Sequence, residues 1–171
     1  MTSRLACCAR QPGHRCRRAL PGAIRGAIVA AGLAFLPASA VAAASCAFSS
    51  VIPVSFGVYD VLSASPNING VGSITIMCQG GGPTTFVVSL STGQSNSFAS
   101  RVMKNGGNSL NYNLYTSAGR TIVWGNGTGG SSTMTVARNQ TTTLSIFGAI
   151  PAAQDVAIGN YLDSISAAVL F

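Results

Sequence analysis

The sequence predicts an all-β fold of the β-sandwich kind. From residue 45 onward, short runs of residues alternate between apolar and polar with a period of two, which is typical of half-buried strands. Clusters of Gly, Asn and Ser separate these runs, as turns require. No stretch of this part of the sequence shows a convincing helical period. Many short strands at such spacing favour two packed sheets in a single domain over residues 45–171.

Before this domain, residues 1–44 predict a secretory signal peptide with cleavage between residues 40 and 45. Six of the ten basic residues precede residue 26, and an apolar run over 27–36 and several small residues follow them. The apolar run is about half the length that spans a bilayer, so a retained transmembrane helix is the weaker interpretation. A lipoprotein interpretation of Ala43 to Cys46 is a further alternative, although alanine stands at Ala43, where leucine is usual. We therefore expect export, with no transmembrane segment in the mature chain.

In the mature part, eight segments read as strands and are separated by turns. The turns fall at Asn69-Gly70 and at the glycine-rich clusters 80–83, 105–107, 118–119 and 125–130. The predicted strands are 51–58, 73–78, 84–90, 109–115, 121–124, 133–138, 142–147 and 161–171.

The composition of the mature part argues against catalysis, metal binding and nucleic-acid binding. Residues 45–171 contain no His and no Glu, with four basic and three acidic residues. General acid–base catalysis and zinc sites of the usual Cys/His kind both depend on residues that are absent here. A nearly neutral body also lacks the basic groove that single-stranded nucleic acids need. We therefore expect neither an enzyme nor a cofactor.

Three residue groups keep an alternative open. A Ser–Lys pair involving Lys104 is conceivable, but residues 103–107 read as a turn and favour a solvated lysine. The glycine run 125–130 lacks the Gly-Lys-Ser/Thr ending of a phosphate loop, so a hairpin turn is the better interpretation. Trp124, Tyr112 and Tyr115 could stack on a sugar or a base, although core packing is the simpler expectation.

Two cysteines remain after removal of the leader, Cys46 and Cys78. In an exported chain such a pair is most simply a disulfide. It would close a loop of about 30 residues and stabilise the domain by roughly 3–4 kcal/mol in the chain-entropy model.

The last predicted strand, 161–171, carries one apolar face. This face consists of the odd-numbered residues Tyr161, Ile165, Ala167, Val169 and Phe171. At a sheet edge, the strand would offer unpaired backbone groups and this apolar face to another chain. The alternative is a terminal strand that earlier strands pair on both sides.

Several motifs, in order and spacing, resemble those of spore coat protein U domains, a family that includes subunits of archaic chaperone–usher pili. The similarity covers essentially all of residues 46–171. The matching segments are Cys46, 54–60, 69–70, 74–78, 88–93, 101–103, 110–115, 123–127, 148–154 and 159–163.

This resemblance implies an immunoglobulin-like sandwich that lacks its seventh strand. In such pilins an apolar groove replaces the missing strand, and β-strand addition fills it. A periplasmic chaperone supplies the strand first and the N-terminal extension of the next subunit supplies it later, at an outer-membrane usher. By the same analogy Cys46 and Cys78 tie the first strand to the second. The odd-numbered residues of 161–171 are then candidates for lining the groove.

One departure from the family pattern concerns the N-terminus. Cleavage between residues 40 and 45 leaves at most five residues before Cys46, which reach only about 17 Å at 3.3 Å per residue. We therefore expect a structural or adhesive subunit that accepts a strand but donates none, in a surface fibre or coat that is reached through the periplasm. The alternatives are a monomeric secreted sandwich that binds a ligand or carbohydrate, and an exported enzyme with an unrecognised site.

Overall fold

The computed structural model describes residues 42–171, so most of the predicted leader lies outside the described residues. These residues form two β-sheets, with one short 3-10 turn, η1 (Gly93–Ser95), and no α-helix within that range. The all-β prediction is therefore confirmed. The strands are β1 (Ser45–Ser55), β2 (Asn67–Gln79), β3 (Thr85–Leu90), β4 (Arg101–Asn105), β5 (Asn108–Tyr115), β6 (Met134–Ala137), β7 (Gln140–Ile150) and β8 (Ala167–Leu170).

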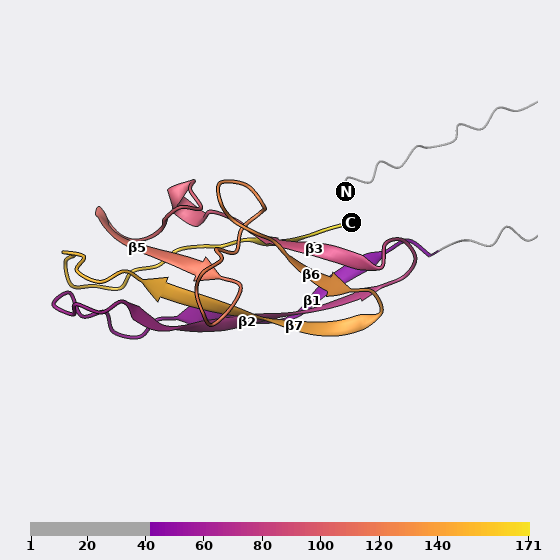
Figure 1. Ribbon diagram of the computed structural model, residues 1–171, viewed down its shortest axis with the longest axis horizontal. Coiled ribbons are helices and arrows are strands. Elements are labelled where there is room, and N and C mark those ends of the chain that lie inside the picture. Colours follow the sequence, from indigo (N-terminus) through magenta and orange to yellow (C-terminus); the bar gives the residue numbers. More distant parts are fainter. Residues whose placement is uncertain (1–41) are drawn as a thin grey trace, which may run out of the picture. The chain divides into compact units, whose positions relative to one another are not determined.

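The two sheets are packed as a sandwich (Figure 1). The larger sheet has the strand order β1-β2-β7-β5-β4, and the smaller sheet has the order β6-β3-β8. All neighbouring strands run antiparallel. Within residues 42–171, β1 forms a ladder with β2 alone and β8 forms a ladder with β3 alone. Each of these two strands therefore has one edge without a ladder partner.

The core lies between the sheets and is built from inward-facing residues of β2, β3, β5 and β7. Ile74, Ile76 and Cys78 alternate along β2 with their side chains almost completely buried, the period of two expected for a strand with one buried face. Trp124 is the largest fully buried side chain, and its indole Nε1 donates to the Val88 carbonyl at 3.1 Å. The tryptophan therefore packs in the core, and the ligand-stacking alternative is not needed to explain it.

A buried arginine fixes the loops beside this core. The Arg101 side chain is fully buried and donates to the carbonyls of Ser91 and Trp124 and to the Asn113 side chain, at 2.7–3.0 Å. Its guanidinium also lies 5.3 Å from the centre of the Phe98 ring. Burial lowers the pKa of Arg101 below its ordinary value, because desolvation disfavours the charged form. Arg101 thus joins β4, β5 and the ends of two loops.

Four predictions about local structure were wrong. The first strand covers Ser45–Ser55 rather than 51–58, and Asn69-Gly70 lies within β2 rather than in a turn. Residues 103–105, expected to belong to a turn over 103–107, are part of β4 instead. β4 pairs with β5 in a hairpin, and only Gly106 and Gly107 form its turn. Residues 121–124 form no strand, because Val123 bridges to Tyr115 while Trp124 bridges to Ser132. The chain here passes from one neighbour to another at successive residues, so no continuous ladder can develop.

The predicted strand over residues 161–171 is partly correct. Only Ala167–Leu170 forms a ladder, with β3. Upstream of β8, the backbone of Leu162 exchanges hydrogen bonds with Lys104 of β4, at 2.8 and 3.0 Å. Residues 161–166 therefore cross from the edge of the larger sheet to the edge of the smaller one, which prevents one continuous ladder.

Candidate functional site

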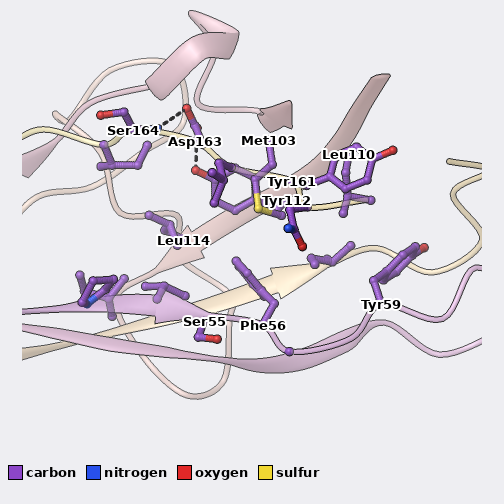
Figure 2. A pocket seen from close by; sticks show the side chains of 18 of the residues that line it. Ser55, Phe56, Tyr59, Met103, Leu110, Tyr112, Leu114, Tyr161, Asp163 and Ser164 are labelled. Carbon is purple, nitrogen blue, oxygen red and sulfur yellow. Dashed lines mark hydrogen bonds between the residues drawn. The ribbon is translucent and has the colours of Figure 1, made fainter. Parts of the chain in front are cut away.

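A cavity of about 1500 Å³ lies between β1 and the C-terminal segment 161–167. We call this cavity the groove (Figure 2). Its lining is mostly apolar and comes from both sheets and from the loops 57–61 and 156–161. Core residues contribute Ile74, Leu90, Met103, Leu110, Tyr112, Leu114, Ile146 and Ile150.

The β1 wall of the groove consists of core-facing side chains that remain exposed among residues 42–171. Phe48 pairs with Ile76 and Val51 pairs with Ile74 across the β1–β2 ladder. Directly opposite residues of neighbouring strands point to the same face of a sheet. Yet Ile76 and Ile74 are almost completely buried, whereas Phe48 is 43 % and Val51 is 61 % exposed. The inner face of β1 therefore carries apolar groups of the kind that a complete sandwich would bury.

The opposite wall is the C-terminal segment. Its odd-numbered residues from 161 to 169 are half-buried, while the even-numbered residues between them are exposed. Of the residues predicted to line the groove, Tyr161, Ile165 and Ala167 do line it. Val169 packs against the core beyond the lining. The Phe171 ring meets the Phe86 ring edge-to-face, with centroids 5.4 Å apart.

Phe56 and Tyr112 form the floor of the groove. The Phe56 ring lies over Gly70 and Gly148, where a Cβ atom would collide with it. These glycines therefore let an aromatic ring lie flat on β2 and β7. The Tyr112 ring meets Phe56 edge-to-face at 5.7 Å between centroids, a favourable aromatic geometry.

Asp163 connects the C-terminal wall to the rest of the domain. Its carboxylate accepts hydrogen bonds from the Tyr112 hydroxyl at 2.7 Å, from the backbone and side-chain amides of Gln94 at 3.0 and 3.2 Å, and from the Ser164 amide at 2.7 Å. Figure 2 shows Asp163 reaching both Tyr112 and Ser164. Burial, together with the hydrogen bond to Asp163, raises the pKa of Tyr112 well above its ordinary value. The phenol therefore stays protonated, and can donate to Asp163, at higher pH than an ordinary tyrosine.

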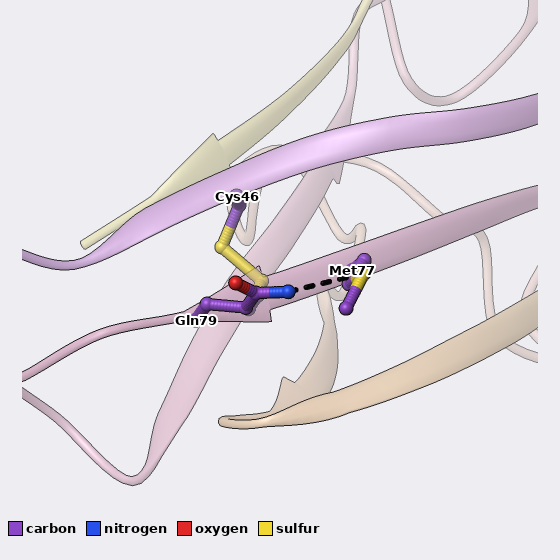
Figure 3. Close-up of a disulfide and its surroundings, with 4 residues drawn as sticks. Cys46, Met77 and Gln79 are labelled. Carbon is purple, nitrogen blue, oxygen red and sulfur yellow. Dashed lines mark hydrogen bonds between the residues drawn. A yellow bond between two sulfur atoms is a disulfide. The ribbon is translucent and has the colours of Figure 1, made fainter.

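The Cys46–Cys78 disulfide links β1 to β2 near the start of β1 (Figure 3). The two residues are direct partners in the ladder, so the bond fastens β1 to the neighbour with which it also pairs. The resemblance implied this pairing, and the structure contains it. Cys78 is buried and Cys46 packs against the core.

Sequence reasoning missed the β1 wall. An undisturbed alternation from Cys46 would put residues 48, 50, 52 and 54 on one face. The ladder is instead irregular between Phe48 and Ser50 and again between Ile52 and Ser55. A bulge inserts a residue and reverses the alternation, so that Val51 follows Phe48 on the inner face. Turn chemistry alone gave no signal for these bulges.

The loops at one end of the groove expose aliphatic side chains. Val58 is 91 %, Leu62 is 90 % and Ile158 is 100 % exposed. The Tyr59 hydroxyl holds the two loops together, because it donates to the Pro151 carbonyl at 2.8 Å and accepts from the Gln154 amide at 3.0 Å. These exposed side chains are therefore presented by loops that hydrogen bonds hold in place.

Three other features that the sequence raises are a Ser–Lys pair, a metal site and a membrane-spanning helix. Lys104 lies in β4, and its Nζ donates to the Ser109 hydroxyl at 2.6 Å, but both residues are exposed and lie outside the groove lining. Among residues 42–171, no three potential metal-ligating side chains form a cluster. The same residues include no helix with the length and hydrophobicity needed to cross a membrane.

Comparison with known families identifies the domain. A family model described as the Spore Coat Protein U domain matches residues 33–168. The chain belongs to this family. Comparison with curated proteins gave no significant match.

One similar solved structure is the CsuC–CsuE chaperone–tip adhesion subunit pre-assembly complex from archaic chaperone–usher Csu pili of Acinetobacter baumannii. The sequence identity is 20 % and the TM-score is 0.49. The match covers 75 % of this chain and 40 % of the other chain, so this chain spans less than half of that protein's length. At this level of similarity, the neighbour carries no argument about partners.

Proposed function

We propose that this chain is a structural subunit of a surface fibre or coat, whose sandwich is completed by a β-strand from another polypeptide. The observation that carries the proposal is the exposure of the core-facing residues Phe48 and Val51 opposite fully buried partners. Both walls of the groove also lack a ladder partner on the groove side within residues 42–171. A strand added there would pair with backbone groups and would bury alternate side chains in the groove.

The partners that fit this role are a periplasmic chaperone, an outer-membrane usher and other subunits of the fibre or coat. Membership of the Spore Coat Protein U domain family supports a structural rather than an enzymatic role. The protein would be exported, pass through the periplasm and reside at the cell surface.

We further propose that the subunit accepts a strand without donating one. This proposal depends on leader cleavage between residues 40 and 45, which leaves too few residues before Cys46 to fill a groove. The family match begins at residue 33, inside the predicted leader, so the cleavage position decides this point. Mass spectrometry of the exported protein measures it, and a mature start near residue 27 would refute the acceptor-only role.

A peptide-assisted refolding experiment tests strand acceptance. The exported protein, with its disulfide intact, is unfolded in guanidinium and refolded with a peptide of alternating Thr and Val. The peptide has 11 residues, the length of β1, plus two lysines for solubility. We expect the peptide to raise the refolded yield and to bind. A peptide of the same composition without alternation is the control, and equal effects of the two peptides would contradict the proposal.

Two neighbouring alanines of β8 provide matched variants. Ala167 lines the groove, whereas Ala168 is exposed on the other face of the strand. A carboxylate in an apolar groove is costly unless it has a partner, so Ala167→Asp should weaken peptide binding more than about tenfold. Ala168→Asp should leave peptide binding unchanged. A monomeric sandwich that needs no added strand, the main alternative, predicts no peptide binding by either variant or by the wild type.

Contact with apolar surfaces is a second candidate function, and the loop tips favour it. Exposed apolar patches often mark an interaction site. The loops that carry the exposed Val58, Leu62 and Ile158 lie at the same end of the domain (Figure 1). Retention on octyl-agarose tests this role. Replacing these three residues by Ser should reduce retention, while replacing the exposed Ile122 elsewhere by Ser should not.

A further inference from the structure

The three side chains Phe56, Tyr112 and Asp163 form a continuous contact path across the groove. Phe56 follows the end of β1, and its ring packs against the Tyr112 ring. The Tyr112 hydroxyl then donates to the Asp163 carboxylate of the opposite wall at 2.7 Å. Tyr112 thus contacts Phe56, the residue that follows β1, with its ring and the C-terminal wall with its hydroxyl. Figure 2 shows the hydroxyl directed at Asp163.

The C-terminal wall needs such an attachment because its backbone is held at only a few points. Leu162 bonds to Lys104, and Ser166 bonds to Ser91. Between these points, the carboxylate of Asp163 is the link that reaches η1 and β5. No ladder covers the groove side of this segment within residues 42–171.

Residue choice around Asp163 fits this attachment. Gly93 adopts a φ of +64°, and a Cβ atom there would collide with the Asp163 carboxylate. Glycine is therefore required for the close approach of the wall to η1. Gln94, the next residue, contributes both its backbone and its side-chain amide to the same carboxylate.

We propose that Tyr112 and Asp163 act as a spacer that holds the two walls of the empty groove apart and ready to receive a strand. The inference rests on the proposed function for what enters the groove. In the protein without a bound strand, the hydrogen bond between the Tyr112 phenol and the Asp163 carboxylate keeps the groove in the shape that accepts one. Without this bond, the segment 163–166 samples positions that narrow the groove, and only a fraction of molecules can accept a strand. The apparent affinity falls by that fraction.

Tyr112→Phe tests the spacer, since it keeps the ring contact with Phe56 and removes the hydrogen bond to Asp163. Tyr115→Phe is the matched control, because Tyr115 lies on the same strand and outside the groove lining. We expect Tyr112→Phe to slow association of the alternating Thr/Val peptide by about tenfold, the scale of one hydrogen bond to a charged group. Asp163→Asn should act in the same direction, and Tyr115→Phe should have no effect.

Amide hydrogen exchange of the free protein provides a readout that does not depend on the peptide. In Tyr112→Phe, the amides of Gln94 and of residues 164–166 should exchange faster than in Tyr115→Phe, while those of β2 and β7 keep their rates. Peptide binding should restore slow exchange in the segment.

The outcomes separate the spacer from the proposed function. Faster exchange spread evenly over the domain, with unchanged peptide association, would show a merely stabilising role and overturn the spacer. If no peptide binds even to the wild type, the proposed function fails, and local exchange at residues 164–166 still decides whether the hydrogen bond holds this wall.

Discussion

The disulfide should account for a large share of the stability of β1. The free energy of unfolding that is lost when it is removed can be estimated from the length of the loop that it closes. Cys46 and Cys78 are separated by 32 residues. For a loop of that size, the chain-entropy model gives about 3.7 kcal/mol of stabilisation at 25 °C. Because β1 pairs with β2 alone and its inner face is exposed, few other contacts can compensate for the loss. We expect the double variant Cys46→Ala, Cys78→Ala to lose about 3–4 kcal/mol of unfolding free energy.

Trp124 provides the assay. It is the only tryptophan of the chain and is fully buried, so its fluorescence in a guanidinium titration reports unfolding of the core. The double variant should unfold at a lower denaturant concentration, and bound peptide should recover part of the difference by holding β1 from its free side. A loss below about 1 kcal/mol would refute the reasoning, because it would mean that non-covalent contacts alone hold β1.

Three further predictions concern Arg101, Gly93 and Tyr112. Arg101→Met should destabilise the domain by about 3–5 kcal/mol in the same titration, since it leaves buried acceptors without a donor. Arg138 is only half-buried and makes a solvent-exposed hydrogen bond to the Gly82 carbonyl, so Arg138→Met should cost under about 1 kcal/mol. Gly93→Ala should lower the free energy of unfolding by about 1–3 kcal/mol. Gly93 has a positive φ, and the Asp163 carboxylate leaves no room for a Cβ atom there. The pKa of Tyr112 is higher in the folded protein than its unfolded value of 10.0. The protonated phenol therefore stabilises the fold fully below pH 10, and this stabilisation is lost progressively as the pH rises above 10 toward the folded-state pKa. Between pH 10 and 11, the wild type should therefore lose up to about 1.4 kcal/mol more than Tyr112→Phe.

The alternation of apolar and polar residues predicted strands correctly where a strand keeps the same neighbours along its length. β3, β5 and β7 lie close to their predicted positions, and the alternation of buried and exposed residues is most regular in β7. The segment 121–124 has strand-like residues too, but Val123 and Trp124 meet different neighbours. Local sequence carries no information about such a change of partner, because the neighbours are set by distant parts of the chain.

The same reasoning explains which parts of the groove were predictable. Alternation placed Tyr161, Ile165 and Ala167 on one face, and all three line the groove. Asp163 lies in the same alternating series, but its carboxylate is not part of an apolar face. Its acceptor role depends on Gln94 and Tyr112, which are 69 and 51 residues away. A contact over such separations becomes visible only once the sheets are assembled.

The two walls of the groove are fastened in ways that oppose closure by the chain itself. β1 is tied to β2 by a ladder and by the disulfide, so moving it toward the C-terminal segment would break backbone hydrogen bonds. The C-terminal segment is held to β4 through Leu162, to η1 through Asp163 and to β3 through β8. Moving it toward β1 would break these contacts as well, each worth about 0.5–3 kcal/mol. Covering Phe48 and Val51 would return only a few kcal/mol of hydrophobic free energy. An open groove with apolar walls is therefore the state that these attachments favour until another strand fills it.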